Sequence, residues 1–484
     1  MNLTELVTTG EAMQEDLGRE YYLTGAGRKA EPEFQKIYDR YRVFLGDEAL
    51  ELVRDSGSLV LLEWLVELRT GRKTSHLDEK QILWEQDTKL DVDGRVIDYL
   101  KAPIELANSA DRAYRIALDD VRAKASAGLD DLRRDRFRLE HEEAARLGMG
   151  GYVEALSTLS GIDFGELGQR SADFLSATQD IYSDCLAELV RGRLGLGLSD
   201  LVRADVAWAF RAEGYDSAFR PESKLDVAVR QMNDMGLDAT HGGRVRFDTE
   251  ERDGKHPRAF CVPVKVPTEV YLVLRPQGGH GDYRTFWHEL GHAMNFASPS
   301  SDMSFEARWL GDNSVTEGFA MLWDHLTADR LWLRKYVELN EGDVQKMGRE
   351  FAVHELYLAR RYAAKLIYEL SLHKSDFVGL GAEYAERLSS ATLFEYTEHD
   401  CLSDVDPGFY CARYLRAWQL EAVLSSSLRE RFDEDWFRNP RAGAFVHELM
   451  SLGQSQPAHE LARSVAETPL TFDPLFDRLV TALS

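Results

Sequence analysis

Two histidines one helical turn apart give the sequence its strongest chemical signal. His288 and His292 lie in the segment TFWHELGH, which has the pattern H-E-x-x-H. In a helix, residues i and i+4 share one face, so both imidazoles can bind one metal ion. Glu289 points in another direction and can take a proton from a water molecule beside that metal. The segment therefore predicts a catalytic zinc (Zn²⁺) site in which Glu289 is the general base.

A catalytic zinc ion usually has three protein ligands and one open position, so a third ligand is needed. The downstream acids that could supply it are Asp302, Glu306, Asp312 and Glu317. We favour Glu317, because it opens an apolar helix that can hold its side chain in a fixed direction. The alternative is a capping box, in which Glu317 bonds the amide of Ser314. Two turns later, Asp324 could hold a ligand histidine through its second ring nitrogen.

Gly291 lies in the middle of the same predicted helix. Glycine at such a position is less favourable than alanine by up to ~1 kcal/mol. The close approach of another backbone would explain it, and so would a tolerated defect.

Other catalytic motifs find no support. Glu289 and His292 could form half of a di-iron site, but that site needs a second Glu-x-x-His, and the sequence has none. The sequence also lacks the P-loop pattern G-x-x-x-x-G-K-[ST] and the nucleophile pattern G-x-S-x-G.

The elements that must position these residues are mostly helices. Prolines number only 13 in 484 residues, and apolar residues recur at helical spacing. The stretch from Ala110 to Glu143 is dense in Arg, Asp and Glu, which predicts a solvated helix face with i,i+4 ion pairs. Between Gly242 and Gly281, glycine, proline and β-branched residues predict a small sheet, with one strand at Val270–Arg275. Helix is expected to resume near Asp282, a possible N-cap.

Composition excludes several classes of function. Asp and Glu number 83 against 58 Lys and Arg, a formal net charge of −25, which argues against binding to nucleic acid. The four cysteines are scattered, so neither a cysteine-based zinc ribbon nor a disulfide framework is indicated. The first residues lack a secretory pattern, and no apolar run could span a membrane. We expect a soluble cytoplasmic protein.

Several segments resemble the thimet oligopeptidase and oligoendopeptidase F family of zinc metallopeptidases. Arg284–Met294 resembles the zinc helix of that family, and Phe247–Lys255 with Ala259–Pro263 resembles the segment before it. Glu317 stands about 25 residues after the second histidine, where the family has its third ligand. The segments Pro407–Tyr414 and Gly453–Ser455 resemble the family's tyrosine-bearing segment and the turn that follows it. The similarity spans about residues 170–484.

The resemblance implies a mainly α, elongated zincin-type fold with a small sheet beside the zinc helix and a deep central cleft. Residues 1–200 would be a helical lobe that forms one cleft wall, and residues 201–484 would be the catalytic lobe. Tyr410 or Tyr414 would stabilise the oxyanion that forms on the substrate carbonyl. The strand at Val270–Arg275 could offer its edge to an extended peptide.

The expected function is hydrolysis of peptide bonds in short oligopeptides by a metalloendopeptidase. Carboxypeptidase or dipeptidyl-carboxypeptidase activity remains an alternative, as do hydrolysis of non-peptide amides and a non-catalytic helical binding protein with a structural zinc. The presence of Glu289 favours catalysis, because a structural site needs no general base.

Overall fold

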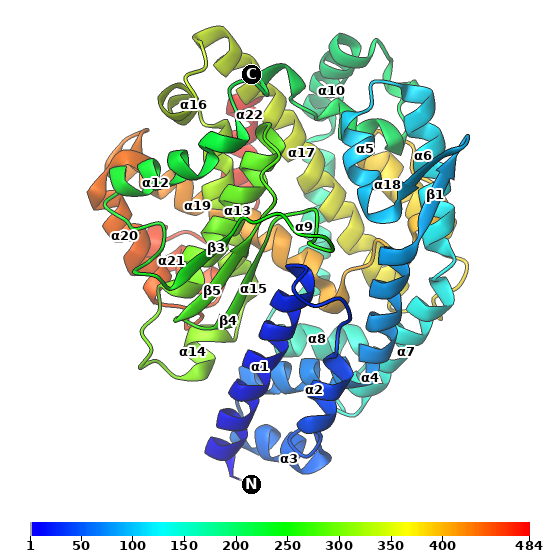
Figure 1. Ribbon diagram of the computed structural model, residues 1–484, viewed down its shortest axis with the longest axis vertical. Helices are drawn as coiled ribbons and strands as arrows, with labels where there is room; N and C mark the ends of the chain where they lie inside the picture. The colour runs from blue at the N-terminus through cyan, green and yellow to red at the C-terminus, as the bar shows by residue number, and fades with distance from the viewer. Residues whose placement is uncertain (1) are drawn as a thin grey trace. The chain divides into compact units, whose positions relative to one another are not determined.

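The computed structural model describes residues 2–484, and helices make up most of this part of the chain (Figure 1). Two small sheets accompany them, one of two strands and one of three. The prediction of a mainly α protein with a small sheet before the H-E-x-x-H helix is therefore confirmed.

The chain folds into two compact units, each built from separate segments. Unit 1 comprises the residues up to Leu65, Ala212–Arg349 and Arg416–Arg478, and unit 2 comprises Val66–Arg211, Glu350–Leu415 and Leu479–Ser484. The expected division had one boundary, near residue 200, whereas the chain enters each unit more than once.

The helices of unit 1 come from all three of its segments. They are α1 (Leu3–Gly25), α2 (Phe34–Arg40), α3 (Asp47–Ser56), α12 (Lys224–Asp234), α13 (His280–Ala297), α14 (Phe305–Trp309), α15 (Asn313–Asp324), α16 (Arg330–Tyr336), α20 (Pro440–Ser451) and α21 (Ala458–Ala466). The helices of unit 2 are α5 (Ala102–Asn108), α6 (Arg112–Ala127), α7 (Asp130–Ala145), α8 (Tyr152–Ser160), α9 (Phe164–Ala177), α10 (Gln179–Leu194), α11 (Val206–Ala209) and α18 (Gly381–Thr392). Four helices have residues in both units: α4 (Leu59–Asp87), α17 (Glu341–Leu372), α19 (Tyr410–Phe432) and α22 (Asp473–Leu483).

The three-stranded sheet of unit 1 has the order β3-β5-β4. Its strands are β3 (Val245–Asp248), β4 (Phe260–Lys265) and β5 (Glu269–Val273). β5 pairs in parallel with β3 and antiparallel with β4, so hydrogen bonds occupy both of its sides. The expectation that the strand at Val270–Arg275 offers a free edge was therefore wrong, and β4 is the edge strand next to it.

The two faces of this sheet pack against different helices (Figure 1). Successive side chains of a strand point to opposite faces, so each face has its own apolar set. Val262 and Val273 pack in one cluster with Tyr22 of α1. Val270 and Leu272 lie in a second cluster, which contains most of the buried side of α13. α13 is thus fixed against the sheet by burial of apolar surface.

α13 begins at His280, two residues before the predicted N-cap at Asp282. The Asp282 carboxylate instead accepts hydrogen bonds from the backbone N–H groups of Gln277 and Gly278, at 2.9 and 2.8 Å. It also accepts one from the buried ammonium of Lys224, at 2.6 Å. Asp282 therefore stabilises the turn that leads into the helix, although it does not begin the helix.

Unit 2 contains a hairpin that was not predicted from the sequence. β1 (Lys89–Val92) and β2 (Arg95–Asp98) are joined by Asp93 and Gly94, both with positive φ, 52° and 87°. An Asp-Gly pair between alternating residues is a strong hairpin signal, so the sequence did carry this information.

The charge-rich segment Ala110–Glu143 forms α6 and α7, but the prediction of a solvated face was wrong for part of it. Arg115 is 1% exposed and donates to Asp205 at 2.9 Å. Arg122 is also buried and bonds Asp400 at 2.7 Å. These arginines have acidic partners far away in the sequence, which offset the desolvation of both charges.

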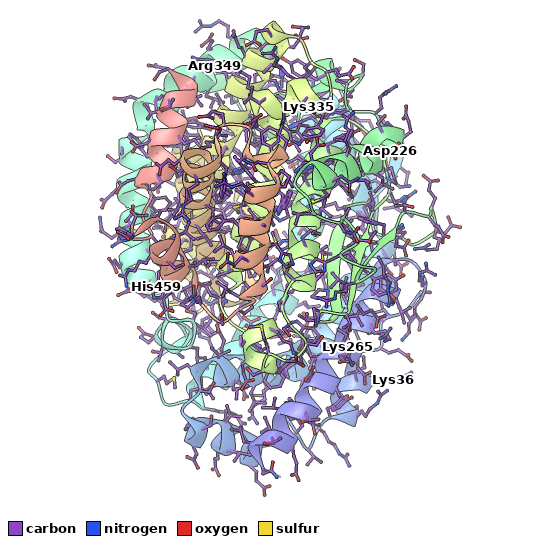
Figure 2. The ribbon with its side chains drawn as sticks, turned by 90° about the vertical axis from the view of Figure 1, so that its left-hand side faces the viewer. Lys36, Asp226, Lys265, Lys335, Arg349 and His459 are labelled. Carbon is purple, nitrogen blue, oxygen red and sulfur yellow. The ribbon has the colours of Figure 1, made fainter. Side chains whose placement is uncertain are left out.

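Other charged side chains lie at the surface, and Lys36, Asp226 and Lys335 of unit 1 point outward (Figure 2). Within residues 2–484, each helix is too short or too polar to cross a lipid bilayer.

Candidate metal centre

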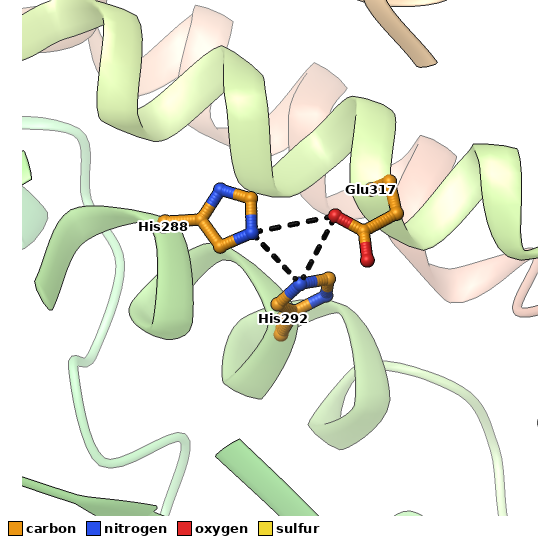
Figure 3. A group of neighbouring side chains, drawn as sticks. All are labelled: His288, His292 and Glu317. Atoms are coloured by element: carbon orange, nitrogen blue, oxygen red, sulfur yellow. Dashed lines mark hydrogen bonds and ion pairs between the residues drawn. The ribbon is translucent and has the colours of Figure 1, made fainter. Parts of the chain in front are cut away.

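Three side chains of unit 1 bring one ligand atom each to a common point (Figure 3). The Nε2 atoms of His288 and His292 lie 3.2 Å apart. The Oε2 atom of Glu317 lies 3.3 Å from the first and 3.5 Å from the second. Sequence reasoning predicted these three residues as ligands, and the structure brings them together.

The helix pair α13 and α15 positions this triad. The histidines lie one turn apart on α13, and Glu317 lies on α15, so the two helices must approach closely. Gly291 allows this approach, because a Cβ atom at that position would lie only 2.7 Å from the Cα of Ala320. Of the two explanations for Gly291, close approach of another backbone is confirmed.

Glu317 does not cap its helix. The side chain of Asp312 is the N-cap of α15 and accepts the Ser314 backbone N–H at 2.9 Å. The capping-box alternative for Glu317 was therefore wrong. Asp302 lies exposed before α14, and Glu306 lies in the first turn of α14. Among the acids considered, Glu317 alone joins the two histidines within the described chain.

The second ring nitrogen of each histidine has a partner on α15. Nδ1 of His288 lies 2.9 Å from Oδ2 of Asp324, as the sequence suggested. Nδ1 of His292 lies 2.8 Å from Oγ1 of Thr316, which the sequence analysis did not single out. A threonine next to a ligand carries no special signal, because its role depends on how two helices cross.

These partners leave the Nε2 atoms suited to a cation. The Asp324 carboxylate accepts the proton on Nδ1 of His288, which leaves a lone pair on Nε2. If His292 also carries its proton on Nδ1, its Nε2 atom has a lone pair as well. The two Nε2 lone pairs and the Glu317 carboxylate oxygen then lie within 3.5 Å of one another. Such a cluster is unfavourable without a positive charge between its atoms. Two imidazoles and a carboxylate are also a donor set that zinc accepts, so the residues present fit this ion.

The electrostatics favour a positive charge at this site, either a proton on His288 or a bound cation. Burial acts to lower the pKa of His288, but its hydrogen bonds with Asp324 and Glu317 raise the pKa well above its ordinary value. Burial also acts to raise the pKa of Asp324, but the Arg284 guanidinium and His325 lower it to about 2. Asp324 is therefore a carboxylate at neutral pH, and the site favours positive charge.

Glu289 contacts the edge strand of the sheet. Its Oε2 accepts the backbone N–H of Cys261 in β4 at 2.8 Å. Burial raises the pKa of Glu289, and His288 and His292 reduce this effect without abolishing it. A carboxylate with a raised pKa binds a proton more readily, which suits the role of a general base.

Tyr410 and Tyr414 lie in unit 2, in the first two turns of α19, and their ring centroids are 5.3 Å apart. They follow a turn in which Gly408 and Phe409 have positive φ, 62° and 55°. The buried Phe409 side chain anchors this turn. Their role in stabilising an oxyanion stays a prediction.

A second group of three possible ligand atoms lies in unit 2, on Glu369, Asp406 and Cys411. Here the ammonium of Lys365 lies 2.8 Å from Oδ1 of Asp406. This group therefore already contains its positive charge, in contrast to the triad in unit 1.

Comparison of the sequence with protein-family models and with curated proteins finds no match. The assignment of a function therefore depends on the chemistry of the site.

Proposed function

We propose that the protein is a zinc-dependent metallopeptidase that hydrolyses short oligopeptides and is related to the thimet oligopeptidase and oligoendopeptidase F family. The observation that carries this proposal is the convergence of His288, His292 and Glu317, with Glu289 directly after the first ligand. A site with only a structural role has no use for a general base at that position.

His288, His292 and Glu317 would hold the zinc ion. When bound, zinc would act as a Lewis acid and would lower the pKa of water at the site to about 7. Glu289 accepts a proton from the attacking water at its carboxylate and later donates it to the leaving amine. Asp324 and Thr316 keep the two imidazoles in the tautomer and orientation that binding requires. Tyr410 or Tyr414 would donate its O–H to the substrate carbonyl oxygen, on which negative charge develops.

The outer edge of β4 is the candidate docking strand for an extended peptide. Cys261 donates its N–H to Glu289, so at this residue the backbone faces away from β5. A peptide paired along this edge would place its main chain beside the general base. Recognition through backbone groups would favour broad side-chain tolerance.

Incubation with a mixed peptide library, followed by mass spectrometry, tests the proposal. We expect cleavage that a chelator abolishes and added Zn²⁺ restores. Internal cuts would indicate an endopeptidase, whereas release of C-terminal residues or dipeptides would favour the exopeptidase alternatives. Folded proteins should resist cleavage if a narrow cleft selects short peptides. If no peptide is cleaved by the zinc-loaded protein, the proposal is wrong.

Glu289→Gln separates catalysis from a structural role for zinc. We expect this variant to keep its zinc content and to lose hydrolysis, because glutamine cannot accept the proton. Glu306→Gln, an acid outside the triad, is the matched control and should retain both zinc and activity. Unchanged turnover in Glu289→Gln would refute the assigned base.

A further inference from the structure

Unit 2 has a pocket of about 470 Å³ whose walls come from three places in the sequence. The junction of α9 and α10 forms one wall, α17 contributes a second, and α18 a third. The residues that matter for its chemistry are Leu175, Gln179, Arg360, Ile367, Glu386 and Ser390. Its volume falls within the range of small-molecule sites, roughly 300–1,000 Å³.

The pocket contains a buried cation that the structure leaves without an acidic partner. Arg360 is 1% exposed. Its guanidinium donates to the carbonyl oxygens of Ala391 at 2.8 Å and Leu175 at 2.6 Å. It also donates to Oγ1 of Thr178 at 2.6 Å and Oε1 of Gln179 at 2.5 Å. All four acceptors are neutral, and no carboxylate within residues 2–484 forms an ion pair with it.

These contacts, together with the Tyr182 ring 4.8 Å from the guanidinium carbon, hold the guanidinium in place, but none of these groups is a carboxylate. Leu175 and Ala391 lie in the last turns of α9 and α18, where helix dipoles provide partial negative charge. Even so, burial lowers the pKa of Arg360 to about 10. The loss of hydration of the charged guanidinium therefore outweighs the stabilisation by neighbouring groups. Arg115 and Arg122, two other buried arginines of this unit, each bond an aspartate. Arg360 is thus a fixed cation beside a cavity, which a carboxylate would complement.

The other residues that line the pocket indicate what kind of ligand would carry this carboxylate. Leu175, Ala364 and Ile367 add apolar surface beside Arg360. Glu386 lies exposed on the α18 wall and can receive an ammonium group. The neighbouring Glu383 is already engaged, because it accepts a hydrogen bond from Arg387 at 2.7 Å.

We propose that this pocket binds an apolar α-amino acid or a dipeptide of such residues, with the carboxylate at Arg360 and the ammonium at Glu386. The site does not depend on the proposed peptidase activity, because all of its residues lie in unit 2 and none belongs to the metal centre.

Isothermal titration calorimetry of the full-length protein with three related probes tests this assignment. L-leucine carries both charged groups, N-acetyl-L-leucine keeps only the carboxylate, and L-leucinamide keeps only the amine. We expect leucine to bind most tightly, N-acetylleucine more weakly, and leucinamide at least about tenfold more weakly than leucine, since it lacks the charge-assisted contact with Arg360. Leucinamide binding as tightly as leucine, or the absence of binding by both carboxylates, would overturn the proposal.

Variants of α18 locate the binding without disturbing the contacts of Arg360. Ser390→Trp should fill the pocket and abolish binding of leucine. Ala382→Trp introduces the same side chain at an exposed position of α18 outside the pocket and should leave binding unchanged. Glu386→Gln should weaken binding of leucine but not of N-acetylleucine. If leucine binds equally well to Ser390→Trp and to the unmodified protein, the ligand lies elsewhere and the pocket is not its site.

Discussion

The Nδ1 atom of His288 lies 2.9 Å from the Oδ2 atom of Asp324, two turns beyond Glu317 on α15. Asp324 thus fixes the imidazole whose other nitrogen faces Glu317 and His292. Partners of this kind typically contribute 10–100-fold to metal affinity. We expect Asp324→Asn to weaken zinc binding by about that factor, as measured by competition with a chromophoric chelator.

Asp302→Asn is the matched control, since it makes the same chemical change at an exposed acid outside the triad. It should leave zinc affinity unchanged. Equal affinities of the Asp324→Asn variant and the unmodified protein would show that the hydrogen bond does not support the metal site.

Gly291→Ala tests the approach of the two helices that carry the ligands. Alanine normally stabilises a helix relative to glycine, but here its Cβ would lie 2.7 Å from the Cα of Ala320. Such overpacking typically costs about 1–3 kcal/mol. We expect a lower midpoint of urea unfolding and a lower zinc affinity, because the helices must separate. Gly192 lies at an exposed site of α10, where an added Cβ would have no atom within 4 Å apart from its own helix backbone and chain neighbours. Gly192→Ala should therefore stabilise the protein by up to ~1 kcal/mol.

The sequence predicted that His288, His292 and Glu317 would lie together, because most of the information for this is local. His288 and His292 share a helix face by periodicity, and Glu317 and Asp324 occupy one later helix. The hairpin at Asp93 and Gly94 has a local signal too, the Asp-Gly pair, although it was not predicted.

Features that depend on long-range packing could not be predicted in the same way. The central position of β5 depends on pairing with β3, a strand that lies before β4 in the sequence. The burial of Arg115 depends on Asp205, 90 residues away. The role of Thr316 depends on the crossing of α13 and α15. A single sequence does not specify these contacts, since each requires the tertiary fold.

The two tyrosines of α19 are expected to differ in their contribution to hydrolysis. Removal of one donor to a developing oxyanion typically lowers kcat about 10²–10³-fold. We expect either Tyr410→Phe or Tyr414→Phe to show this loss with unchanged zinc content, and the other variant to show a much smaller effect. Steady-state kinetics on a fluorogenic peptide and metal analysis measure both quantities. If neither variant changes kcat, the oxyanion donor is another group.

Asp248 should make unit 1 sensitive to acid. Its carboxylate is buried on β3 and accepts hydrogen bonds from Tyr22 of α1 at 3.0 Å and from the buried Lys255 at 3.0 Å. Burial acts to raise its pKa, but the hydrogen bonds from Arg252, Lys255 and Tyr22 lower it from 3.8 to about 2. Because the pKa is lower in the folded state, the stabilisation is complete above the unfolded-state pKa and is lost as the pH falls through about 2. A shift of this size corresponds to roughly 2 kcal/mol.

Urea unfolding followed from neutral pH to acid should show this loss, and Asp248→Asn should remove that part of the pH dependence. Asp253→Asn, an exposed acid in the following loop, should keep it. An identical acid profile for Asp248→Asn and the unmodified protein would show that the contacts of Asp248 do not stabilise the fold.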